Sequence, residues 1–191
     1  MINLPELAND ADRRDPAPGD LELLRQFINT ADIDEGTDEV ATPVALSAWY
    51  ASRGLPLAGR TLTDADHARA IDLRETLREV LQIHGGHPVS ATTTAHFGDL
   101  AESVPLRLDV RSQPRLVAAD DTDPALARLL GIAFESMTGG TWKRLKVCRN
   151  DACRWAYYDH SRNASGAWCR MAICGNRMKG QRFRARKGSA A

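Results

Sequence analysis

All four cysteines of the chain lie near its C-terminal end, in two pairs. Cys148 and Cys153 form the first pair, and Cys169 and Cys174 form the second, with four residues inside each pair and fifteen between the pairs. Two close pairs of thiolates joined by a short loop are the pattern that a tetrahedral structural zinc site requires. The sequence therefore predicts one structural Zn²⁺, and the segment around it must fold about that metal.

This segment of about fifty residues has few large apolar side chains and cannot build a core of its own. Metal binding would supply the missing free energy of folding, roughly 10 kcal/mol or more. Four sulfur ligands leave the metal no position for water, so we predict no catalytic residue and no enzyme activity. His160, which lies between the pairs, is an alternative ligand that four thiolates make unnecessary.

Net charge divides the chain into two unlike parts. Residues 141–191 contain thirteen Lys and Arg against two Asp, a net charge of +11, and the other 140 residues have a net charge of −11. A basic arm on an acidic body attracts polyanions, nucleic acid first. The alternative is that the two parts neutralise each other within the fold.

The basic arm also supplies the candidate nucleic-acid contacts. A helix expected over residues 167–187 carries basic side chains on opposite sides, with Lys179, Arg182 and Arg186 on one narrow arc. Such a helix either lies along phosphates or is a solubilising tail that frays after Gly180. The candidate contacts are Arg154, Arg162, Arg170, Arg177, Lys179, Arg182, Arg184, Arg186 and Lys187.

The rest of the chain has the patterning of a mainly helical body. Helical spacing of apolar residues, with Thr42 and a Thr63–Asp66 capping box as start signals, predicts helices near 20–31, 43–53, 63–84, 91–103 and 124–138. Alternation over 104–110 predicts a half-buried strand with Leu108 and Val110 inward, paired with a strand at 115–119. We expect Met137 on the inner face of the last body helix.

The predicted fold class is α+β, in three parts. Residues 1–19 are a loose lead-in and residues 20–140 a helical domain with one β-hairpin. Residues 141–191 are a small treble-clef-like zinc finger in the order knuckle, hairpin and helix.

For the other residues that could bind a ligand, a position in the core is the better interpretation. His84 lies on an apolar helix face, where a core or capping role is expected. Trp49, Tyr50 and Trp142 suit core packing better than a small-molecule pocket between body and finger. The N-terminus has no signal-peptide pattern and no apolar run reaches membrane length, so we expect a cytoplasmic protein. In that reducing compartment the cysteine spacing favours metal over disulfides.

The residues around the second cysteine pair, Cys174-Gly175-Asn176-Arg177, resemble the motif that names the CGNR zinc finger family. The segment 144–148 and Tyr157-Tyr158-Asp159 resemble its surroundings. The body resembles the ABATE domain through Phe27-Ile28-Asn29-Thr30 and Trp49. The resemblance implies a bacterial, stress-induced transcription regulator whose four cysteines bind zinc and whose finger binds DNA.

These patterns together predict a zinc-dependent DNA-binding transcription regulator whose body senses a signal or contacts a partner. RNA is an alternative target, and no membrane partner is expected. Two other functions stay open. One is a protein-interaction module that zinc holds in shape, and the other is a small-molecule or redox sensor without DNA binding. The sequence leaves the oligomeric state undetermined.

Overall fold

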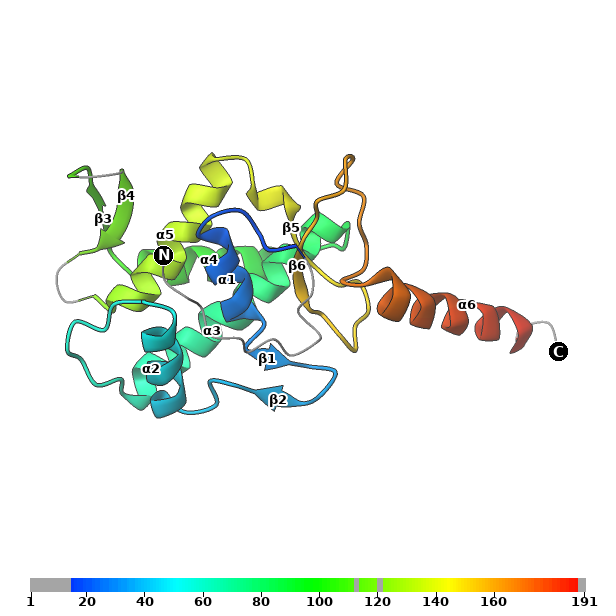
Figure 1. The fold of residues 1–191 in the computed structure, drawn as a ribbon, viewed down its shortest axis with the longest axis horizontal. Helices are drawn as coiled ribbons and strands as arrows, with labels where there is room; N and C mark the ends of the chain where they lie inside the picture. Colours follow the sequence, from blue (N-terminus) through cyan, green and yellow to red (C-terminus); the bar gives the residue numbers. More distant parts are fainter. Residues whose placement is uncertain (1–14, 112–113, 120–121, 189–191) are drawn as a thin grey trace.

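The computed structural model of the protein describes residues 15–111, 114–119 and 122–188. The predicted α+β class is confirmed: helices form most of the body, and three two-stranded antiparallel hairpins lie around them (Figure 1). The lead-in predicted at 1–19 falls largely outside the described residues. Within those residues, no helix combines the length and the apolar character needed to cross a membrane.

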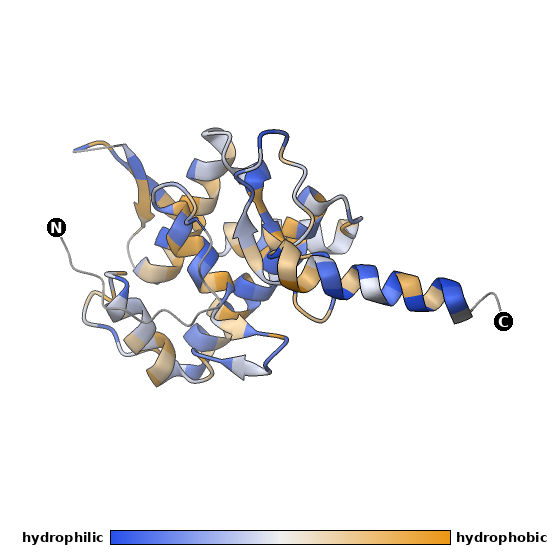
Figure 2. Ribbon diagram, turned by 45° about the vertical axis from the view of Figure 1, so that its right-hand side comes forward, coloured by the Kyte–Doolittle hydropathy of each residue, from blue (hydrophilic) through white to orange (hydrophobic). Residues whose placement is uncertain are grey.

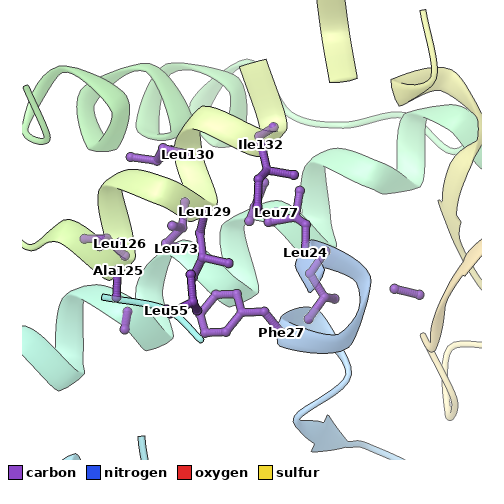
Figure 3. Packing of buried hydrophobic residues seen from close by; sticks show 14 of the residues in the cluster. Leu24, Phe27, Leu55, Leu73, Leu77, Ala125, Leu126, Leu129, Leu130 and Ile132 are labelled. Atoms are coloured by element: carbon purple, nitrogen blue, oxygen red, sulfur yellow. The ribbon is translucent and has the colours of Figure 1, made fainter. Parts of the chain in front are cut away.

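Helices α1 (Leu21–Ile28), α3 (Asp64–Val80) and α5 (Pro124–Thr138) form the centre of the body. Their apolar faces meet in one core, in which Leu24, Phe27, Leu73, Leu77 and Leu129 are almost completely buried (Figure 3). Helix α2 (Pro43–Ser52) packs against α3 and adds buried side chains from one side. Burial of these leucine and aromatic side chains is the main stabilising contribution to the body.

The remaining elements lie around this centre. They are β1 (Ala31–Asp32), β2 (Thr37–Asp38), η2 (Leu81–Gly85), α4 (Ala91–Glu102), β3 (Leu106–Asp109), β4 (Arg115–Ala118), η3 (Trp142–Arg144), β5 (Leu145–Val147), β6 (Ala156–Tyr158), η4 (Met171–Gly175) and α6 (Asn176–Gly188).

The helices begin where their capping residues predicted. Thr63 accepts a hydrogen bond from the Asp66 backbone N–H at 3.2 Å, and Asp66 accepts one from the Thr63 N–H at 2.9 Å, so the capping box is complete. Thr42 caps α2 in the same way, with Pro43 at the first helical position. Local side-chain chemistry therefore fixes the start of these helices independently of the core.

The β3–β4 hairpin corrects one prediction. Leu108 and Val110 were expected to be buried, but they are 63% and 65% exposed. The reason is that β4 packs against α5 and β3 lies outside it (Figure 1). A Cβ at Gly131 of α5 would lie 3.2 Å from the Leu116 carbonyl oxygen, so glycine permits this close approach. Met137, predicted to point inward, is 37% exposed near the end of α5.

Candidate metal centre and basic helix

The four cysteine sulfurs form one buried cluster. All four Sγ atoms lie within 4.8 Å of one another, and the Cys169 sulfur lies 3.6 Å from those of Cys153 and Cys174. A tetrahedral Zn²⁺ with Zn–S bonds of about 2.3 Å places its sulfurs about 3.8 Å apart. A disulfide needs a separation of about 2.0 Å, and none is formed. The geometry of the cluster therefore fits a tetrahedral thiolate site.

The thiols in this cluster cannot all ionise unless a cation joins them. Interactions with Cys148 raise the pKa of Cys153 to about 12. Hydrogen bonding to Cys148 and Cys153, together with burial, raises the pKa of Cys169 well above its usual range. Like charges packed this closely repel strongly in a buried site. A divalent cation among the sulfurs would remove that repulsion, which is why the donor set suits a metal such as zinc.

The first pair lies on a tight turn after β5. The buried Asn150 accepts hydrogen bonds at its carbonyl oxygen from the backbone N–H groups of Cys153 at 2.8 Å and Arg154 at 3.0 Å. Its side-chain Nδ2 lies 3.7 Å from the Cys174 sulfur and donates to it. Arg154 adopts a left-handed conformation, with φ of 47°, as the chain turns back into β6. Asn150 therefore links the two pairs through a contact outside the sulfur cluster.

The second pair spans the start of the terminal helix. Cys169 precedes it, and residues Met171–Gly175 form a single π-helical turn in which the Gly175 N–H donates to the Arg170 carbonyl at 3.1 Å. The helix predicted from about residue 167 therefore begins later, as a π turn that continues into α6. The wider turn brings the Cys174 sulfur back to Cys169. The finger contains the predicted knuckle, hairpin and helix, but the first knuckle lies at the tip of the β5–β6 hairpin instead of before it.

A buried ion pair supports the loop between the cysteine pairs. Lys146 Nζ donates to Asp159 Oδ2 at 2.8 Å and to the Ala164 carbonyl at 2.5 Å. Burial raises the pKa of Asp159, but hydrogen bonds from Lys146, Ser161 and Gly166 outweigh it and hold this pKa well below its usual range. Sequence reasoning missed this role because it counted Lys146 only as part of the basic surface.

The finger docks on the body through side chains that bind main-chain atoms. Asn29, which follows α1, donates to the Ala156 carbonyl at 2.8 Å and accepts from the Ala156 N–H at 2.7 Å. The fully buried Arg78 of α3 donates to the carbonyls of Ile28 at 2.5 Å, Ala31 at 3.1 Å and Arg154 at 3.1 Å. These contacts hold strand β6 and the first knuckle against the body.

The aromatic residues considered as possible pocket walls are core residues. Trp49, Tyr50 and Trp142 are all buried, and Trp49 packs on Phe27 with ring centroids 5.7 Å apart. His84, in η2, lies at the junction itself: its Nδ1 is 2.7 Å from the Leu145 carbonyl, and its ring meets Trp142 edge-on. His160, the alternative metal ligand, contacts the Pro16 carbonyl and is outside the cysteine cluster.

His84 makes the body–finger junction sensitive to pH. Burial lowers its pKa below 6.5, so the neutral ring is favoured in the folded protein. Because the unfolded chain binds a proton more readily, stability from this group is present above about pH 6.5 and is lost as pH falls through the folded pKa. His84→Gln is expected to flatten the pH dependence of urea unfolding below about pH 6.5. An unchanged slope, relative to the wild type and to His160→Gln at an exposed histidine, would contradict this.

A cleft opens beside the cysteine cluster, between the finger and the β1–β2 hairpin of the body. Its volume is about 270 Å³, and its wall includes Asp34 on the hairpin and the ligand candidates Cys153 and Cys169. Arg177, the arginine of the Cys-Gly-Asn-Arg motif, crosses this cleft and contacts both Asp34 carboxylate oxygens at 3.0 and 2.8 Å. One predicted nucleic-acid contact is therefore paired with the acidic body.

The other predicted basic contacts fall into two groups. Arg154 and Arg170 are half-buried beside the cysteine turns, and Arg162 is exposed in the loop between the pairs. The remaining five lie exposed on α6, and none forms an ion pair within the described part of the chain; they are Lys179, Arg182, Arg184, Arg186 and Lys187. Helix α6 extends away from the body, and hydrophilic residues dominate it beyond the finger (Figures 1 and 2). It continues through Gly180 without a break.

Comparison with known families agrees with both parts of the fold. Residues 144–187 match the family model of the CGNR zinc finger. Residues 21–140 match the ABATE model, described as "Putative stress-induced transcription regulator". No curated protein matches the sequence. Because the ABATE match covers more than half of the chain, and the cysteine cluster lies inside the finger match, the protein belongs to the ABATE family and carries a C-terminal CGNR zinc finger.

Proposed function

We propose that the protein is a DNA-binding transcription regulator in which one structural Zn²⁺ holds the finger and α6 contacts the phosphates. The observation that carries this proposal is α6 itself. Its thirteen residues include six Lys and Arg and no acidic residue, and the helix lies outside the body. A helix of this length spans about 20 Å, comparable with the reach of a recognition element across one groove of DNA.

The side chains of α6 are arranged for a polyanion rather than for the acidic body. Lys179, Arg182 and Arg186 line one shallow depression along the helix. Among the basic side chains of α6, only Arg177, at the base of the helix, pairs with a carboxylate in the described part of the body. Unpaired cations on an exposed helix release counterions from nucleic acid when they bind phosphates, and this release favours association. The acidic body therefore neutralises one basic side chain of α6, and the other five remain available to bind phosphates.

The role proposed for the zinc is structural. Four thiolates fill a tetrahedron, so the site would hold the knuckle, the loop and the π turn together without a position for substrate or water. The body, which the finger docks on through Asn29 and Arg78, is the part that would respond to a signal. The proposed activity is thus regulated binding without catalysis.

Fluorescence anisotropy tests the DNA contact. It measures binding of a labelled DNA duplex of about 20 base pairs over a range of salt concentrations. We expect a steep fall in affinity with salt. Arg182→Gln/Arg186→Gln should reduce the slope of log K against log salt by about 1.8, since each lost phosphate contact removes about 0.9. Affinity at low salt should fall by at least about tenfold.

The double variant Arg69→Gln/Arg111→Gln removes the same charge from exposed positions outside α6 and is the matched control. It should leave both affinity and slope unchanged. Equal effects of the two double variants would mean that only overall charge matters and would contradict the proposal. Duplex and single-stranded RNA competitors of the same length then decide between DNA and RNA as the target.

A further inference from the structure

The body contains a cavity of about 430 Å³ that the proposed DNA contact does not use. It lies between the end of α2, the β3–β4 hairpin and the start of α5, at the end of the body opposite α6 (Figure 1). Four arginines line it, Arg53, Arg107, Arg115 and Arg128, against one acid, Asp20. We call it the arginine cavity. Four cations around one cavity are unexpected in a body whose net charge is −11.

The arginines come together from three elements. Arg53 follows the end of α2, and Arg128 is on α5. In the hairpin, Arg107 pairs with Val117 and Asp109 pairs with Arg115, so Arg107 and Arg115 are diagonal neighbours on the same face. Asp109 lies opposite Arg115 on that face and partly offsets its charge, but it forms its ion pair with Arg111, which leaves the cavity arginines in excess of nearby carboxylates.

Among the described residues, Arg128 is the one member of the four that forms ion pairs. Arg128 contacts both oxygens of Glu135 at 3.0 Å and also the carboxylate of Asp20. Arg53 lies over the Trp49 ring at 5.6 Å, and its buried Nε has no hydrogen-bond partner in the part of the chain that the structure describes. Neither Arg53 nor Arg107 forms an ion pair with any described residue. The exposed guanidinium groups of Arg107 and Arg115 are therefore available as donors at the cavity wall.

The rest of the wall is largely apolar. Leu23, Leu55 and Val117 contribute to it, beside two prolines. The volume is in the range of small-molecule sites, which combine apolar walls with a few convergent polar groups. A nucleic-acid surface is instead usually a basic stripe that follows the phosphate backbone. The guanidinium forks suit a carboxylate or phosphate group, which they bind through paired hydrogen bonds.

We infer that the arginine cavity binds a small organic anion, in which a carboxylate or phosphate contacts Arg53, Arg107 and Arg115 while an apolar part lies against Leu55 and Val117. This inference rests on the proposed role of the body as the sensor of a signal and names the chemical class of that signal. The calorimetric titration that tests it contains no nucleic acid, so the inference and the proposed DNA binding can fail separately.

The test is calorimetric titration of the full-length, zinc-loaded protein with phenyl phosphate and with benzoate, and with benzamide as the uncharged probe of matched shape. Saturable binding of at least one anion and none of benzamide is expected. Arg107→Gln/Arg115→Gln should lower the affinity for the anion by about tenfold or more, because hydrogen bonds to charged groups are lost. Both residues are exposed, so circular dichroism and zinc content should not change.

Arg111→Gln is the control, since Arg111 is an exposed arginine of the same hairpin that does not line the cavity. It should bind the anion within about twofold of the wild type. Absence of saturable binding by either anion, equal binding of benzamide, or equal effects of the two variants would overturn the inference. A loss of duplex DNA affinity in Arg107→Gln/Arg115→Gln as large as that in the α6 variant would also overturn it, by assigning these arginines to the nucleic-acid surface.

Discussion

Cys169→Ser is expected to unfold the finger between residues 145 and 174 and to separate α6 from the body. Cys169 lies at the centre of the cluster, 3.6 Å from two other sulfurs, so its loss opens the ligand set. Structural zinc contributes roughly 10 kcal/mol to the folding of such modules, more than the finger's small apolar core can replace. Hydrogen–deuterium exchange should show lost protection over the finger, while α1, α3 and α5 stay protected.

The wild-type protein should contain one zinc per chain by elemental analysis, and Cys169→Ser should contain much less. His160→Ala is the control, because His160 lies between the pairs but contacts Pro16 instead of the cluster. It should retain both zinc and protection. Full protection of the finger in Cys169→Ser, or after removal of zinc with a chelator, would contradict a metal-dependent fold.

Arg78→Met should destabilise the body by about 3 kcal/mol or more, because each buried acceptor left without a donor costs about 1–3 kcal/mol. The guanidinium is fully buried and donates to three carbonyls, two in the body and that of Arg154 in the finger. Methionine fills a similar volume but leaves these acceptors without a donor. Urea unfolding followed by circular dichroism measures the change.

Arg69→Met is the control, because it removes the same kind of side chain from the same helix, α3. Arg69 is exposed, and the buried Asp66 carboxylate that it contacts keeps its hydrogen bonds from the Thr63 N–H and hydroxyl without it, so its replacement should cost less than about 1 kcal/mol. Equal loss of stability in the two variants would contradict the prediction, because it would mean that losing any positive charge from α3 matters as much as losing the buried hydrogen bonds of Arg78. Exchange at the backbone of 154–158 should increase in Arg78→Met alone, because only that variant releases the knuckle.

Features that depend on local chemistry could be predicted from the sequence. The cysteine spacing predicted the cluster, and capping residues such as Thr63 predicted helix starts, because in both cases the interacting groups are close along the chain. The exposed basic helix was also predictable, since α6 has too few apolar residues to be buried.

Contacts between the body and the finger could not be predicted in this way. Asn29 binds Ala156 across 127 positions, and its partners are backbone atoms, which carry no residue-specific signal. Lys146 was indistinguishable from the surrounding surface cations until the fold placed it beside Asp159. Alternation in β3 could not reveal that β4 occupies the inner position against α5. The arginine cavity likewise draws its side chains from elements far apart in sequence.

The contacts of Arg78 have a thermodynamic consequence for metal affinity. One guanidinium bridges α1, the chain after it and the first knuckle, so the folded body stabilises the metal-bound finger. Linkage is reciprocal, and metal bound at the knuckle must stabilise the body by the same free energy. The melting temperature of the body should therefore rise with free zinc concentration. An excised finger should bind zinc more weakly than the intact chain does.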